Sequence, residues 1–92
     1  MDAGTGQDQV DALVVAFGRV LAAERTAAGY SLQELSKRSG LSVESLHRYE
    51  HAKREVRLGD LRKITDALGV TPSELVTAAE RRAARGAPAA DQ

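Results

Sequence analysis

The side chains with the clearest chemical use lie close together near the middle of the chain. Arg48 can donate two hydrogen bonds to O6 and N7 of guanine, and Glu44 can accept one from the amino group of cytosine. Val43 can pack against the methyl group of thymine. Lys53 and Arg54 follow shortly after and can neutralise backbone phosphates. This chemistry would suit contacts with duplex DNA at a site that contains G·C pairs.

Two other interpretations of this segment remain open. Glu44 and Arg48 are four residues apart, so on a helix they can form an ion pair that merely faces solvent. His47 and His51 are one helical turn apart, a spacing that can chelate a metal ion. The zinc-protease motif requires Glu directly after the first His, however, and Arg48 occupies that position without an evident third ligand. We therefore expect no metal and no cofactor.

The elements that must position these side chains are two short helices joined by a tight turn, over about residues 31–51. Ser31 and Glu34 form an S-x-x-E capping box at the start of the first helix. Gly40 supplies the left-handed backbone of a turn, and Ser42 caps the second helix. Two helices joined in this way form a helix-turn-helix, which can place its second helix in the major groove of DNA.

The rest of the chain predicts three further helices and no strand. Apolar residues recur at helical spacing over 10–28 and again over 58–68, and each run is followed by glycine. Thr71 caps a last helix, with Pro72 at its first position and Glu74 completing a capping box. We expect an all-α, compact five-helix domain over 10–85 that contains the helix-turn-helix, flanked by a disordered N-terminal segment, 1–9, and a disordered tail, 86–92. The expected core comprises Leu13, Phe17, Leu21, Leu32, Leu35, Leu41, Leu46, Leu61, Ile64, Leu68 and Leu75.

Composition argues against several other classes of protein. The chain has 92 residues, which fit one domain, and no cysteine, which excludes disulfides and thiolate zinc sites. No apolar run approaches the roughly 18 residues of a membrane span, and the polar, acidic N-terminus does not resemble a secretory signal. One Phe and two Tyr are too few to stack single-stranded bases. No triad, phosphate loop or catalytic carboxylate pair is recognisable, so we do not expect an enzyme.

The charges cancel overall but are unevenly distributed. Thirteen basic and 13 acidic residues give a net charge of zero, which counts against a nucleic-acid-binding protein because such domains are usually basic. Residues 19–58 hold eight bases and five acids, whereas residues 1–18 hold three acids and no base. The positive excess therefore lies on the candidate DNA-binding segment, 19–58; it is small, so specificity must depend on a few contacts.

Over about residues 17–76 the chain resembles the XRE-type helix-turn-helix family, which includes phage repressors and Cro proteins. The features in register are Arg25, Ser31, Leu35, Gly40-Leu41-Ser42, Leu46, Glu50, Lys53-Arg54 and the segment 67–75, ALGVTPSEL. The resemblance implies an ion pair between Arg25 and Glu50 that ties the first helix to the end of the third. It also places Val43, Glu44 and Arg48 at base-reading positions; Ser45 and His47 can project from the same helix, away from Leu46 and Tyr49.

The chain departs from the family pattern at several positions. Leu32 replaces a Gln that contacts phosphate in many members, so we expect that contact to be lost and Leu32 to pack inward. Ser36 and Ser39 replace a small and an apolar residue. Ala52 stands where Gly often closes the third helix; a left-handed Ala there would cost on the order of 1 kcal/mol. Val56 replaces a common Pro in the connector.

The resemblance implies a sequence-specific double-stranded DNA-binding transcriptional regulator, a repressor, acting in the cytoplasm on the nucleoid. We expect contacts to the DNA backbone from Ser31, Gln33, Ser42, His51, Lys53 and Arg54. The expected partner is an operator bound by a homodimer through the C-terminal helix. Its apolar stripe is Leu75, Val76, Ala79 and Ala83, unless that stripe folds back onto the first helix. The alternative is a protein-interaction module, such as an antitoxin or regulatory subunit, which net neutrality and Leu32 would suit.

Overall fold

Five helices and no strand make up residues 3–90, the part of the chain that this computed structural model describes; side chains are described for residues 6–86. The helices are α1 (Ala3–Ala27), α2 (Leu32–Ser39), α3 (Val43–Glu50), α4 (Leu58–Leu68) and α5 (Pro72–Ala90). The all-α prediction is confirmed. None of these helices is long and apolar enough to cross a membrane.

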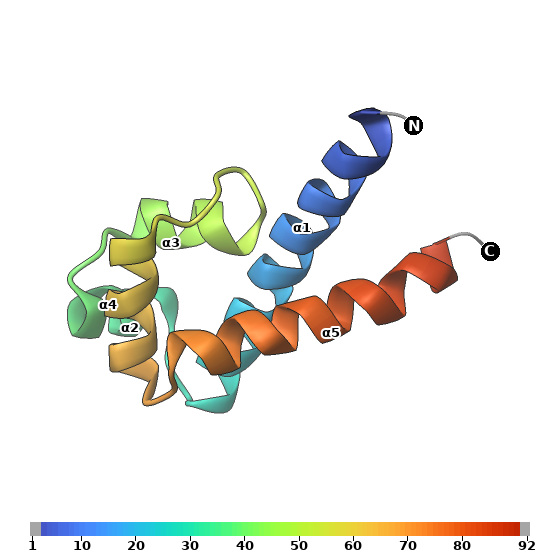
Figure 1. Cartoon of the computed structure of the whole chain (residues 1–92). Helices are drawn as coiled ribbons and strands as arrows, with labels where there is room; N and C mark the ends of the chain where they lie inside the picture. The colour runs from blue at the N-terminus through green and yellow to red at the C-terminus, as the bar shows by residue number, and fades with distance from the viewer. Residues whose placement is uncertain (1–2, 91–92) are drawn as a thin grey trace.

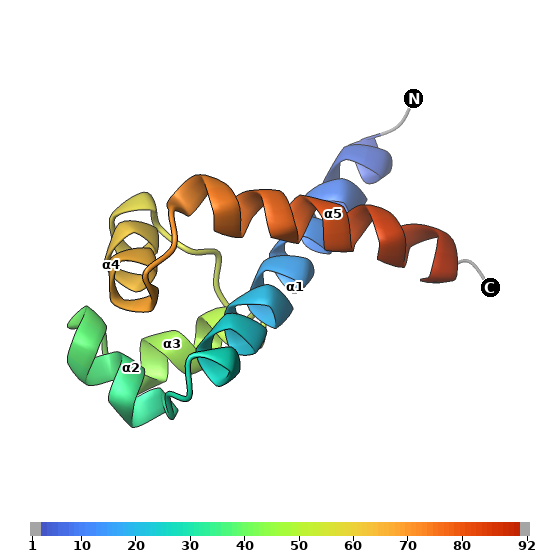
Figure 2. The same ribbon diagram turned by 90° about the horizontal axis from the view of Figure 1, so that it is seen from below.

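The two long helices, α1 and α5, pack against each other and form the support for the three short ones. Figure 1 shows α2, α3 and α4 gathered at one end of this pair, with the N-terminal end of α1 and the C-terminal end of α5 projecting from the other. Figure 2 shows α5 crossing over α1. Because α1 also packs against α3, and α2 packs against both α3 and α4, the helix-turn-helix is held on two sides.

The capping residues act largely as the sequence predicts. The hydroxyl of Ser31 accepts from the amide of Glu34 at 3.0 Å, while the carboxylate of Glu34 accepts from Arg38 instead of closing the expected box. At the start of α5 the box is complete, since the amide of Thr71 donates to Glu74 and the amide of Glu74 donates to the Thr71 hydroxyl. These bonds satisfy amides that a helix start leaves without partners.

The core lies where the five helices meet, and each of them contributes to it. Its buried apolar residues are Ala16, Phe17, Val20, Leu21, Leu35, Leu46, Tyr49, Leu61, Ile64, Leu75 and Ala79. Leu32, Leu41 and Leu68 are only partly buried against it. Leu13 was expected in the core but is 36% exposed, at the edge of the core where α1 faces the segment 54–56 and α5.

Helical structure extends into both end segments that the sequence predicts to be disordered. Helix α1 already begins at Ala3 and α5 continues to Ala90, so the described parts of 1–9 and 86–92 are helical; residues 1, 2, 91 and 92 lie outside the described range. Extending an existing helix is far easier than starting one. A side-chain hydrogen bond from Gln7 to Asp11 at 2.9 Å adds support in α1, and alanines favour the helix in α5.

The proposed dimer stripe on the last helix is the inward face of α5. Leu75 and Ala79 are each 1% exposed, within a core to which α1 contributes Phe17 and Leu21, and Val76 and Ala83 are partly buried against it. The structure therefore shows the alternative arrangement, in which this stripe folds back onto α1. A dimer would need another surface.

Tyr49 joins α3 to α4 through a buried hydroxyl that donates to the carboxylate of Asp60. Burial, and then this hydrogen bond, raises the pKa of Tyr49 above its ordinary value. A raised pKa in the folded state means that the stabilisation is complete below the unfolded value of about 10 and is lost as the pH rises through the folded value.

Replacing Tyr49 by Phe should therefore lower the free energy of unfolding by about 1 kcal/mol at pH 7, through the lost hydrogen bond. The decline in stability above pH ~10 should become shallower, because no phenol remains to ionise at that site. Urea unfolding of both proteins between pH 7 and 11 measures the two effects. If the free energy of unfolding declined equally in both proteins above pH ~10, the Tyr49 phenol would not be the group that causes the decline.

Candidate nucleic-acid interface

Helix α3 presents one face to the core and another to solvent. Leu46 and Tyr49 are buried and fix its rotation. Of the predicted base-reading residues, Glu44 and His47 are exposed, and Val43, Ser45 and Arg48 are half-buried. The face that carries these five side chains is thus open to a partner, as a helix must be to enter the major groove.

In the free protein, Arg48 and Glu44 are paired. Arg48 Nη2 lies 2.9 Å from Glu44 Oε2, with 43% and 73% of the two side chains exposed. In the free protein, these two residues therefore form the solvent-facing ion pair that was the alternative to base reading. Such a pair contributes only about 0.2–0.5 kcal/mol, whereas a bidentate contact to guanine discriminates by about 1–3 kcal/mol. The pair can therefore open for a matching base.

His47 and His51 stack on each other rather than converging on a metal. Their ring centroids are 4.0 Å apart, and His51 Nδ1 lies 2.9 Å from the carbonyl oxygen of His47. Across the described side chains, no group of three His, Cys, Asp or Glu residues could hold a metal ion.

The predicted backbone-contacting residues lie at helix starts and in the connector that follows α3. Ser31 and Ser42 are the exposed N-caps of α2 and α3, and the Ser42 hydroxyl accepts from the amide of Ser45 at 3.0 Å. Gln33, Lys53 and Arg54 are exposed, as is His51, the C-cap of α3. The ends of two short helices and one loop therefore carry these groups, a pattern suited to phosphate contacts.

A largely buried ion pair anchors the end of α3 to α1. Arg25 Nε and Nη2 donate to the two carboxylate oxygens of Glu50 at 2.6 and 3.0 Å, and Arg25 Nη1 donates to the carbonyl oxygen of Tyr30 at 2.9 Å. Only 18% of the Arg25 side chain and 4% of the Glu50 side chain are exposed. The hydrogen bond to Glu50 raises the pKa of Arg25, against the lowering effect of burial. The predicted Arg25–Glu50 pair is confirmed.

Gly18 allows the backbones of α1 and α3 to touch, which the sequence analysis missed. A Cβ at this position would lie 2.4 Å from the carbonyl oxygen of Glu50 and 2.7 Å from that of Tyr49. The available signal was a glycine in the middle of an apolar helical run, which indicates a close backbone approach.

The departures from the family pattern have local explanations. Leu32 packs against the core, as predicted. The hydroxyl of Ser36 donates to the carbonyl oxygen of Leu41 at 2.6 Å, and the hydroxyl of Ser39 accepts from the amide of Leu41 at 3.2 Å. The hydroxyls of Ser36 and Ser39 therefore stabilise the turn between α2 and α3.

Ala52 adopts the left-handed conformation that the family usually assigns to glycine. Its φ is +56°, and it is the sole non-glycine residue with positive φ in the described chain. Helix α3 consequently ends at Glu50, and the amide of Lys53 turns back to bond the carbonyl oxygen of Arg48 at 2.8 Å. This turn directs the connector that bears Lys53 and Arg54.

The change Ala52→Gly should raise the free energy of unfolding by about 1 kcal/mol, because glycine adopts this conformation without the steric penalty of Cβ. Thermal or urea unfolding measures the gain. Ala28→Gly, in the exposed turn after α1, is a suitable comparison and should not stabilise, since Ala28 lacks positive φ. If Ala52→Gly lowered the free energy of unfolding, the backbone at Ala52 would not be strained.

Comparisons with known proteins agree with this geometry. A family model described as "Helix-turn-helix domain" matches residues 16–79. A solved structure of the clp gene regulator ClgR from Corynebacterium glutamicum superposes with a TM-score of 0.81 at 29% identity, covering 86% of this chain and 84% of that one. The restriction-modification controller protein C.AhdI from Aeromonas hydrophila gives a TM-score of 0.66 at 37% identity, covering 67% of this chain and 94% of that one.

A further structure of ClgR gives a TM-score of 0.68 at 30% identity, over 73% of this chain and 87% of that one. No curated protein sequence matches this chain significantly.

Proposed function

Because the chain belongs to the helix-turn-helix domain family, we propose that it is a DNA-binding transcriptional regulator that reads its operator with α3. The observation that supports this most is the fixed orientation of α3. Its buried side and the Arg25–Glu50 pair hold it rigidly, and its open side carries Val43, Glu44 and Arg48. A rigid helix with such a face suits direct readout of bases.

In this proposal, Arg48 leaves Glu44 to bind a guanine, and Val43 packs on the methyl group of a neighbouring thymine. Ser45 and His47 line the same face, and Glu44 accepts from cytosine or orients Arg48. Ser31, Gln33, Ser42, His51, Lys53 and Arg54 bind phosphates on both sides of the groove. The protein represses transcription from the cytoplasm by occupying the operator on the nucleoid, as two copies on two half-sites, and has no catalytic role.

Arg48→Ala tests the proposal. We expect the affinity for the preferred duplex to fall by about 1–3 kcal/mol, roughly 5- to 150-fold, and preference for guanine at one position to disappear. Binding to unrelated duplexes should change little. Fluorescence anisotropy with matched and scrambled duplexes, at one salt concentration, measures both effects.

Arg62→Ala is the matched control, since Arg62 is also exposed and pairs with Asp66 at i,i+4, but on α4. It should leave affinity and preference unchanged. If Arg48→Ala behaves like Arg62→Ala, base reading by Arg48 is wrong. The protein-interaction module, which the zero net charge and the inward-packed Leu32 favour, would then become the better account.

A further inference from the structure

The outer parts of α1 and α5 diverge from each other and leave a groove of about 570 Å³ between them. Sites for small molecules in proteins have volumes of about 300–1,000 Å³, so the groove has a suitable size. Its apolar lining consists of Ala12, Ala16 and Ala83 together with Val15, which is 43% exposed. None of the residues proposed above to contact DNA lines this groove.

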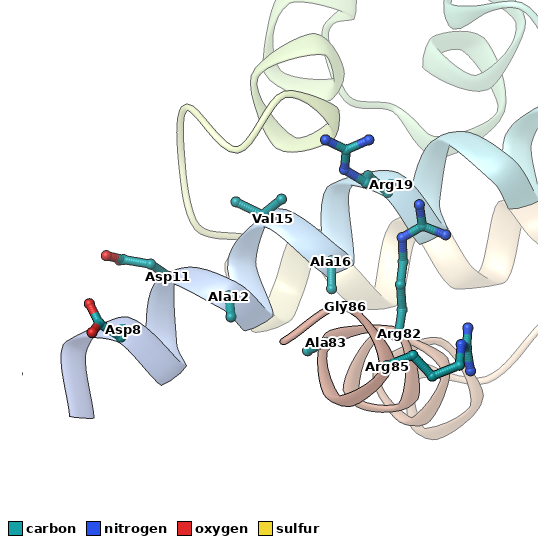
Figure 3. A pocket seen from close by; sticks show the side chains of 10 residues that line it. All are labelled: Asp8, Asp11, Ala12, Val15, Ala16, Arg19, Arg82, Ala83, Arg85 and Gly86. Atoms are coloured by element: carbon teal, nitrogen blue, oxygen red, sulfur yellow. The ribbon is translucent and has the colours of Figure 1, made fainter. Parts of the chain in front are cut away.

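The charged side chains of this groove are separated along its length. Figure 3 shows two aspartates at one end of the groove and three arginines at the other. They are Asp8 and Asp11, and Arg19, Arg82 and Arg85. Because Arg19 belongs to α1 and the other two arginines belong to α5, both walls are basic at the same end. Like charges on facing walls repel each other unless an anion lies between them.

No carboxylate within residues 6–86 lies at ion-pair distance from Arg19, Arg82 or Arg85. The ion pairs formed within this range involve other arginines, and although Asp8 and Asp11 line the same groove, they pair with none of its three arginines. A guanidinium group can bind a carboxylate through two parallel hydrogen bonds. The basic end of the groove is therefore suited to an anion that is not part of these residues.

We propose that this groove binds a small organic anion, a carboxylate with an aliphatic body. The carboxylate lies among Arg19, Arg82 and Arg85, and the aliphatic body lies along Val15 and the alanines of the lining. The arginines provide charged, bidentate donors for the head of such a ligand. The body removes the exposed part of Val15 from water, which is favourable for any apolar surface. The groove thus matches both parts of the ligand.

Two features favour this ligand over the backbone of DNA or an acidic protein segment. Asp8 and Asp11 restrict an anion to one end of the groove, whereas a run of phosphates or acidic residues that followed the groove would reach them and be repelled. The alanines and Val15 also offer no hydrogen-bond donor to a phosphate. A single negative charge on an apolar body meets neither obstacle.

The groove also borders the end of α3. Val15 and Arg19 line the groove, and the same two side chains line a depression that they form with Glu50, His51 and Ala52. A ligand held by Arg19 would therefore lie beside the end of the proposed reading helix. This gives the ligand a regulatory position, a consequence that rests on the proposed function, whereas the binding site itself does not.

Titration of the isotope-labelled full chain with sodium octanoate, followed by nuclear magnetic resonance, tests the proposal without DNA. Octanoate should shift the amide signals of Val15 and Ala83 in a saturable manner. It should bind at least about tenfold more tightly than acetate or 1-octanol. Acetate lacks the aliphatic body and 1-octanol lacks the charge, so each control compound loses one of the two matched interactions.

Two pairs of variants locate the ligand. Arg82→Gln should weaken octanoate binding by about tenfold, because a charged donor is lost, whereas Arg81→Gln, at an exposed neighbour that does not line the groove, should not. Ala83→Leu should weaken binding by filling the groove, whereas Ala84→Leu, at an exposed residue outside it, should not. Circular dichroism should show all four variants folded.

Several results would overturn the proposal. Equal affinity for octanoate and acetate would mean that exposed arginines attract any anion, and equal affinity for octanoate and 1-octanol would mean that charge plays no part. Equal effects of Arg82→Gln and Arg81→Gln would place the ligand elsewhere. Groove signals that shift with duplex DNA but not with octanoate would assign the groove to DNA. Because the octanoate titration contains no DNA, a failure of operator binding would leave its result unchanged.

Discussion

Replacing Arg25 by Ala is expected to lower the free energy of unfolding by about 3–5 kcal/mol, the largest effect of any single change considered. The Glu50 side chain is 4% exposed, and its carboxylate accepts two hydrogen bonds from Arg25. Without the guanidinium, a buried charge would have no compensation, and the carbonyl oxygen of Tyr30 would lose a donor. Since a small domain has about 5–15 kcal/mol of stability in total, the variant should be close to unfolding at physiological temperature.

Urea unfolding at pH 7 measures this loss. Arg62→Ala serves as the control, because it removes an exposed pair and should cost no more than about 0.5 kcal/mol. Arg25→Ala/Glu50→Ala should be less destabilised than the sum of the two single changes, since removing both partners leaves no uncompensated charge. Additive losses would mean that the two residues act independently, contrary to the anchor described above.

Gly18→Ala should lower the free energy of unfolding by about 2–3 kcal/mol despite the better helix propensity of Ala. The added Cβ would meet the carbonyl oxygens of Glu50 and Tyr49 at 2.4 and 2.7 Å, and these are backbone atoms that cannot move without shifting α3. The displaced α3 should also weaken DNA binding beyond the loss of stability, because base contacts depend on its orientation.

Gly59→Ala is the matched control for this change. Gly59 also lies in a helix, but a Cβ there would meet nothing within 4 Å, so the substitution should stabilise by about 0.5–1 kcal/mol. The two variants should therefore shift the melting temperature in opposite directions, which thermal unfolding measures. A stabilised Gly18→Ala protein would show that α1 and α3 do not approach so closely.

The local signals in the sequence predicted the helices well. Serines and glycines at helix ends have specific backbone effects, so the bounds of α2, α3 and α4 follow closely from Ser31, Gly40, Ser42 and Gly69. The Arg25–Glu50 pair came from the family resemblance, because no local rule connects residues 25 positions apart.

Features that depend on the packing of distant helices were predicted less well. Leu13 fits a core pattern, but it is 36% exposed at the edge of the core, beside the segment 54–56 and α5, and helical periodicity does not show where the core ends. The stripe on α5 was expected at a dimer interface, with packing onto α1 as the alternative, and helical periodicity alone could not decide between these two arrangements. The role of Gly18 depends on where α3 crosses α1, which a single sequence does not specify.

The measurement that tests the central claim most directly is selection of bound duplexes from a random DNA pool by the purified chain, near physiological salt. The account predicts a two-fold motif with G·C pairs in each half-site and a spacing of about 10 base pairs between half-site centres. Lack of any enriched sequence, with protein shown to be folded, would contradict base reading by α3 and favour a protein partner instead.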